Sequence, residues 1–187
     1  PTEIYTVSLH DALPIYIENY NKPTNEITEF PSLFFIGSMD WQPNLQGLYW
    51  FLNKIWLNIY NEFPGLTFYI AGRNIPETLT KSNYPQVVIV GEVENAISFI
   101  HSKAIMLVPL LSGGGIRIKI IEAMAAAKTI ISTAIGAEGI DYTDRQNILI
   151  ANNVNEFRSC INLCINDKKC ADEIGFNARK FIVDNHN

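Results

Sequence analysis

One stretch, residues 107–135 (LVPLLSGGGIRIKIIEAMAAAKTIISTAI), constrains the fold of this chain more than any other. Residues 104–110 form a short apolar run, the pattern of a parallel strand that is covered on both faces. The glycines at 113–115 allow a tight turn and a close approach to a ligand, because no Cβ stands in the way. Apolar residues then recur at helical period over 116–127, and a second apolar run covers 129–133. We therefore predict a strand, a glycine turn, a helix and another strand.

The end of this predicted helix that faces the glycine turn suits an anion. The N–H groups of a first helical turn lack partners and carry a partial positive charge. Arg117 and Lys119 add two full positive charges there, and Glu122 follows on the same helix, where a carboxylate can accept hydrogen bonds from sugar hydroxyls. The stretch contains neither G-x-x-x-x-G-K-[ST] nor G-x-G-x-x-G. The pattern predicts a site for an anion such as phosphate, but not a P-loop or a dinucleotide fingerprint.

The remainder of the chain alternates predicted strands and helices. Such alternation favours an α/β fold, a Rossmann-like doubly wound parallel sheet with helices on both faces. Ligands of open parallel sheets bind at the carboxyl ends of the strands, where Arg73 follows the second predicted strand. The further predicted strands are 32–37, 66–71, 87–90 and 147–151, and the further predicted helices are 43–61, 96–101 and 154–165.

Composition excludes several classes of protein. The chain has 187 residues, of which 48% are hydrophobic and 18% charged, enough apolar material for one well-buried domain. Its net charge of −5 argues against a nucleic-acid partner. No apolar run approaches the roughly 20 residues that cross a bilayer. Cys160, Cys164 and Cys170 lack a histidine that would complete a zinc pattern, so we expect reduced thiols in a cytoplasmic protein.

Two motifs resemble those of a known family. S-G-G-G-I-R-I-K-I-I-E-A-M-A, followed by K-T-I-I-S-T-A-I-G-A-E-G-I, resembles the donor-binding core of the family-4 (group 1) glycosyltransferases. F-I-G-S-M-D-W-x-P-N is similar to the opening of the donor domain in one branch of that family. Because these are retaining enzymes of the GT-B fold, the resemblance implies that residues 32–187 form a nucleotide-sugar-binding Rossmann-like domain. That domain would be the C-terminal half of a two-domain GT-B enzyme.

The resemblance also implies a reaction and a set of site residues. The enzyme would move a sugar from a nucleotide diphosphate sugar to a glycan or lipid-linked acceptor, with no metal and no other cofactor. The expected catalytic residues are Arg117 and Lys119, which would offset charge on the leaving diphosphate, and Glu122, which would hold the ribose. The expected donor-binding residues are Gly37, Ser38, Arg73, Val93, Gly113, Gly114, Gly115, Ile116, Arg117, Lys119 and Glu122.

The chain departs from the family at two positions. Many relatives place an arginine and a lysine on the loop after the first strand, where this chain has Ser38, Met39 and Asp40. We therefore expect the basic pair of the helix to supply that charge. The family also commonly carries two glutamates separated by seven residues; Glu122 matches the second, and Gly114 stands in place of the first. The second departure indicates altered donor choice, a weak or inactive enzyme or, as we favour, a branch that uses the glycine turn instead.

The N-terminal residues are expected to lie outside the domain. Residues 2–15 resemble a translated sequencing adapter, so we expect 1–15 to be non-native, and 16–31 reads as a linker. The acceptor site would lie on a missing N-terminal domain. We therefore expect this chain alone to bind donor weakly and to transfer nothing. The family's habits suggest surface polysaccharide biosynthesis in the cytoplasm, with peripheral association at the inner face of the membrane through the missing half.

Other functions need features that the chain lacks or supplies only in part. A nicotinamide-dependent dehydrogenase needs a glycine fingerprint and an acidic residue after the second strand, whereas Gly37 stands alone and Arg73 follows that strand. A receiver domain needs an aspartate after the third strand, where only Glu92 and Glu94 occur. For a GT-B nucleotide-sugar epimerase, His101 is the one candidate histidine. The epimerase and a non-catalytic Rossmann-like nucleotide-binding module stay as alternatives.

Overall fold

The computed structural model describes residues 19–20, 27–115 and 117–185. Within them, six strands form one sheet in the order β3-β2-β1-β4-β5-β6, and every neighbouring pair is parallel. This order and direction confirm the predicted Rossmann-like α/β fold. The strands are β1 (Glu29–Ile36), β2 (Thr67–Ala71), β3 (Val87–Gly91), β4 (Lys103–Val108), β5 (Thr129–Ser132) and β6 (Leu149–Ile150).

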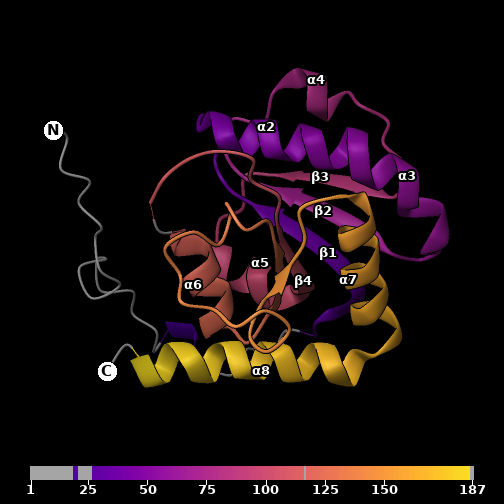
Figure 1. Ribbon diagram of the computed structural model, residues 1–187. Helices are drawn as coiled ribbons and strands as arrows, with labels where there is room; N and C mark the ends of the chain where they lie inside the picture. The colour runs from indigo at the N-terminus through magenta and orange to yellow at the C-terminus, as the bar shows by residue number, and fades with distance from the viewer. Residues whose placement is uncertain (1–18, 21–26, 116, 186–187) are drawn as a thin grey trace, which may run out of the picture.

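Helices cover both faces of the sheet (Figure 1). One face carries a continuous helical rod, formed by α2 (Gln42–Trp50), the π-helical turn η2 (Phe51–Trp56), α3 (Leu57–Ile59) and the 3₁₀ turn η3 (Tyr60–Glu62), together with α7 (Val154–Asn166). The other face carries α5 (Ala96–Ser102) and α6 (Ile118–Ala125). A short helix, α4 (Glu77–Thr80), follows β2, and the long α8 (Lys168–Asn185) runs past α6 and α7.

The central strands β1, β4 and β5 read as apolar runs because the core lies on both sides of them. Leu33 and Phe35 of β1 pack into the cluster under the α2 rod and α7, whereas Phe34 between them packs with α5 and α6. All three side chains are fully buried. Neighbouring side chains of a strand point to opposite faces, so a strand without a solvent face shows no polar alternation.

Several element boundaries differ from the prediction, among them the starts of β1 and α6. β1 begins at Glu29, so residues 29–31 of the predicted linker belong to the sheet. The Glu29 carboxylate is held there because it accepts a 2.6 Å hydrogen bond from Tyr69 Oη and pairs with Lys103. Helix α6 begins at Ile118 rather than at 116, because Arg117 has an extended backbone with ψ of 92°. Residues 1–15 lie outside the described residues.

Helix α8 packs at Gly175 directly against the backbone that precedes β5, and a substitution there tests this contact. A Cβ at this position would lie 2.3 Å from the carbonyl oxygen of Ala127, an atom of the backbone that cannot swing aside. We expect Gly175→Ala to destabilise the chain by about 1–3 kcal/mol, even though alanine favours helix. Chemical denaturation followed by circular dichroism measures this change. Glu173→Ala, an exposed substitution in the same helix, is the control; an equal stability for both variants would show that α8 is not seated so closely.

The reactivity of the cysteine thiols tests whether the face of α7 that carries Cys160 and Cys164 is buried. Cys160 and Cys164 are buried, and burial raises their pKa to about 11 and about 12. A raised pKa leaves these thiols protonated at pH 8, and the thiolate is the reactive form. We expect iodoacetamide at pH 8 to modify Cys170 first in the native chain, and all three residues in urea. Mass spectrometry of tryptic peptides reads this out, and equal labelling of Cys164 and Cys170 in the native state would contradict it.

Candidate functional site

A crevice opens at the carboxyl edge of the sheet, beside the point where the chain reverses its winding direction. β1 and β4 are neighbours there, and the connections that follow them leave toward opposite faces. Open α/β sheets place their ligands at such a point. Two adjoining cavities of about 220 and 410 Å³ form the crevice, and they share Ile36, Gly37 and Ala96. We call this space the carboxyl-edge crevice.

The crevice gathers most of the site residues that the sequence suggested. Gly37, Ser38, Arg73 and Val93 line the smaller cavity. Gly37 also lines the larger one, together with Arg117, Lys119 and Glu122. The glycines at 113, 114 and 115 line neither cavity, and Ile116 lies outside the described residues.

The Lys119 amine reaches from α6 across to the loop that follows β1. Its Nζ donates a 2.6 Å hydrogen bond to Asn44 Oδ1, and Asn44 Nδ2 donates a 2.8 Å hydrogen bond to the carbonyl oxygen of Ser38. A Cβ at position 37 would lie 3.3 Å from Lys119 Nζ and 2.8 Å from Asn44 Nδ2, so glycine leaves the room for this network. The amine also lies 4.7 Å from the centre of the Phe35 ring. The Lys119 amine therefore lies beside the loop after β1, residues 37–41, which contains no lysine or arginine.

The surroundings of Lys119 weaken its hold on the proton. Burial and then the neighbouring Arg117 charge lower the pKa of this amine to about 7. Both effects disfavour the ammonium form. Near neutral pH the amine is therefore poised between its charged and neutral forms, and a bound anion would favour the charged form.

Arg117 holds the glycine turn from the inside. Its Nη1 donates to the carbonyl oxygens of Gly114 and Gly115 at 2.6 and 2.5 Å, and its Nη2 donates to that of Gly113 at 2.6 Å. The guanidinium carbon lies 4.9 Å from the centre of the Trp41 ring, and only 6% of the residue is exposed. Burial lowers the pKa of this guanidinium, and Glu138 opposes the shift. Among the described residues, Arg117 Nε has no hydrogen-bond partner although it is buried.

The turn depends on glycine at two of its three positions. Gly113 and Gly115 have φ of 108° and 86°, a region that side chains disfavour. A Cβ at position 113 would also lie 2.8 Å from the Trp41 ring. A Cβ at position 114 would meet open space, so the fold itself does not exclude a glutamate there.

Glu122 lines the crevice and also contacts Tyr20. The two side chains are hydrogen-bonded, and burial raises the pKa of the Glu122 carboxyl, an effect that the Tyr20 bond opposes. The pKa of Tyr20 is also raised, by burial first and then by the Glu122 charge and hydrogen bond. Tyr20 is 6% exposed and belongs to the core, although sequence reasoning assigned it to the linker.

Sequence reasoning also missed Trp41 and Asn44 as site residues. Both stand in the D-W-x-P-N motif, which does carry a signal. Pro43 near the start of α2 explains part of that motif as a helix start, which hides what the flanking side chains contact. Their partners, Arg117 and Lys119, lie far along the chain and are found only in the folded structure.

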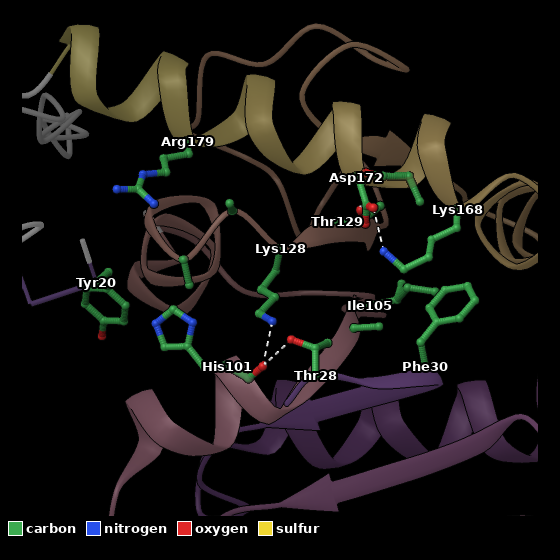
Figure 2. Close-up of a pocket in the computed structure, with 14 residues that line it drawn as sticks. Tyr20, Thr28, Phe30, His101, Ile105, Lys128, Thr129, Lys168, Asp172 and Arg179 are labelled. Atoms are coloured by element: carbon green, nitrogen blue, oxygen red, sulfur yellow. Dashed lines mark hydrogen bonds and ion pairs between the residues drawn. The ribbon is translucent and has the colours of Figure 1, made fainter. Parts of the chain in front are cut away.

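A third cavity, larger than either cavity of the crevice, lies toward the other edge of the sheet, beside the amino ends of β4 and β5 (Figure 2). We call it the amino-edge cavity; its volume is about 550 Å³. Lys128 Nζ and Thr28 Oγ1 both donate to the carbonyl oxygen of His101 at 2.9 Å, and Lys168 pairs with Asp172 at 2.5 Å. None of the expected donor residues lines it.

No helix among residues 19–20, 27–115 and 117–185 is both long and apolar enough to span a bilayer. The same residues bring together no group of three or more histidine, cysteine, aspartate or glutamate side chains that could hold a metal ion.

Comparison with known proteins identifies the family of this chain. Residues 30–167 match the model of the family described as glycosyl transferases group 1. An uncharacterised 44.6 kDa protein in the cps region of Klebsiella pneumoniae is 30% identical over 164 residues, which are 83% of this chain and 42% of that protein. This chain thus spans less than half the length of that relative.

Solved structures share the fold at low identity. The C-terminal domain of a glycosyl transferase group 1 family protein (LpcC) from Francisella tularensis has a TM-score of 0.66 at 14% identity, over 91% of this chain and 90% of that one. Anabaena HepE in complex with UDP has a TM-score of 0.65 at 13% identity, over 83% of this chain and 44% of that one.

Proposed function

This chain belongs to the glycosyl transferases of group 1, and from that premise we propose that its carboxyl-edge crevice binds the nucleotide diphosphate sugar that a retaining transferase uses as donor. The observation that carries the proposal is the Lys119 amine, held beside the Gly37 backbone at the end of β1. A diphosphate in this crevice would meet that cation directly. The acceptor site and the rest of the catalytic machinery are proposed to lie on a further N-terminal domain.

The chemistry of the proposed reaction divides among the residues of the crevice. When the bond between the sugar C1 and the diphosphate oxygen breaks, its electron pair stays on the diphosphate. The Lys119 ammonium would stabilise that developing charge, and Arg117 would add its own charge while fixing the glycine turn. Glu122 would accept hydrogen bonds from the ribose, and Arg73 and Val93 would flank the nucleoside. The proposal assigns no metal and no other cofactor to the site.

A binding panel tests this proposal. UDP, GDP, ADP and NAD would be added separately to the 187-residue chain and followed by ligand-detected NMR. UDP is the first probe because a structural neighbour was solved with it. We expect one nucleoside diphosphate to bind weakly and Lys119→Met to lose that binding, while Lys168→Met, which alters the amino-edge cavity, keeps it. Binding of NAD alone would overturn the proposal.

The crevice favours transfer over the epimerase alternative. Such an epimerase would use a histidine along the crevice, and His101 instead lines the amino-edge cavity. His101 lies near the C-terminal end of α5, whereas Ala96, the first residue of that helix, lines the crevice. The length of α5 therefore separates His101 from the crevice.

The acceptor and its location follow from the family and are part of the same proposal. The cps-region relative supports a role in surface polysaccharide biosynthesis. The acceptor would be a glycan or a lipid-linked glycan. The enzyme would act in the cytoplasm, and its N-terminal domain would bring it to the inner face of the membrane.

A further inference from the structure

We propose that Asn44 is a positioning residue for the donor diphosphate: it holds the Lys119 amine beside the Gly37 backbone and ties that amine to the backbone of the loop after β1. The inference rests on the proposed function and adds a residue that the family motifs of α6 do not contain. Asn44 comes from α2, on the opposite face of the sheet from α6.

The amide of Asn44 is oriented by its two partners. Its Nδ2 donates to the carbonyl oxygen of Ser38 at 2.8 Å, so its oxygen must turn the other way, toward Lys119 Nζ at 2.6 Å. Asn44 is 5% exposed and therefore has little freedom to exchange these bonds for water. The side chain acts as a fixed bridge across the crevice floor, from the loop after β1 to α6.

Asn44 suits this task because its amide is neutral. An oxygen acceptor favours the ammonium form of the lysine, whereas a carboxylate at the same place would also repel a diphosphate. An alkyl side chain would leave the amine without its acceptor. The lysine side chain has four rotatable carbons and keeps one position only where a partner holds it.

Few other charges face this amine. Arg117 lies on the same helix and lowers the pKa of Lys119, and Glu122 lines the same cavity. From the loop after β1, Asp40 is engaged with Ser38 Oγ and Asn74 Nδ2. The lining residues that α2 and α5 contribute, Asn44 and Ala96, carry no charge. The state of the amine is therefore sensitive to its bond with Asn44.

The experiment measures UDP and pyrophosphate affinity of the full chain between pH 6.5 and 8.5. We expect Asn44→Leu to weaken both affinities roughly 5- to 10-fold at pH 7 and to move the midpoint of the pH profile down. Asn44→Asp should move that midpoint up, because a carboxylate favours the ammonium. Asn58→Leu, an exposed asparagine of α3 remote from the crevice, is the matched control and should change neither quantity.

A measurement on the unmodified chain covers the case in which a variant does not fold. The side-chain amide resonances of Asn44 should shift with the protonation of Lys119 near pH 7 and again when pyrophosphate is added. Resonances that ignore both changes, or an Asn44→Leu variant with unaltered affinity and midpoint, would overturn the inference while leaving the donor site in place. Failure of the unmodified chain to bind any nucleoside diphosphate would overturn both.

Discussion

Replacing Arg117 by alanine should weaken nucleoside diphosphate binding roughly 30- to 100-fold, and replacing it by lysine should restore little of that loss. The guanidinium binds three consecutive carbonyl oxygens of the glycine turn. A hydrogen bond to a charged group contributes about 1.5–3 kcal/mol, so losing this set leaves the turn without its internal support. A lysine has the charge but not the planar fork that meets several oxygens at once.

The lysine variant separates two roles of Arg117. If the side chain acted on the diphosphate only as a positive charge, Arg117→Lys would bind nearly as well as the unmodified chain. If it builds the turn, both variants should lose binding to a similar degree, as titration calorimetry with UDP would show. Arg179→Ala, which removes an arginine from the amino-edge cavity, is the control and should leave the affinity unchanged.

Donor affinity should fall as pH rises above 7, and Lys119→Met should abolish this dependence along with most of the binding. The pKa of the free amine is about 7, and a bound diphosphate would raise it, so the complex holds more protons than the free chain. By linkage, binding then weakens with increasing pH, roughly tenfold between pH 7 and 8.5. Loss of the charge-assisted contact itself would cost about 10- to 100-fold.

Proton uptake on binding directly checks the direction of this pH dependence. Calorimetry at pH 8 in buffers of different ionisation enthalpy should show nearly one proton taken up per UDP bound by the unmodified chain and none by Lys119→Met. Lys128→Met, which alters a buried lysine of the amino-edge cavity, is the control and should retain the uptake. Proton release, or an affinity that is flat across this pH range, would contradict the role given to Lys119.

The sequence was sufficient to predict the fold and the edge of the sheet that carries the crevice. A strand buried on both faces leaves a continuous apolar run, as Leu33, Phe34 and Phe35 do. Because all the strands are parallel, residues that follow different strands meet at one edge. That rule alone brings Gly37 of the first loop and Lys119 beyond the fourth strand into the same crevice.

The direction of individual side chains could not be predicted in this way. Lys119 bonds to Asn44, which lies 75 residues earlier, and no local pattern encodes that pairing. Arg117 turns back onto the glycine carbonyls because burial leaves it no water, whereas the sequence suggested a cation facing the ligand. Tyr20 reaches the core from a polar stretch whose composition resembles a linker. Each of these depends on the packed surroundings of the residue.

A titration of the isotopically labelled chain with UDP, followed by two-dimensional amide NMR, tells whether the donor binds in the carboxyl-edge crevice. The carboxyl-edge crevice and the amino-edge cavity lie at opposite edges of one sheet, and the amino-edge cavity, which is larger than either cavity of the crevice, is not the proposed site. We expect shifts of the amide resonances of Gly37, Ser38 and Lys119, and no shift of those of Lys128 and Asp172. Shifts confined to the residues of the amino-edge cavity would contradict it.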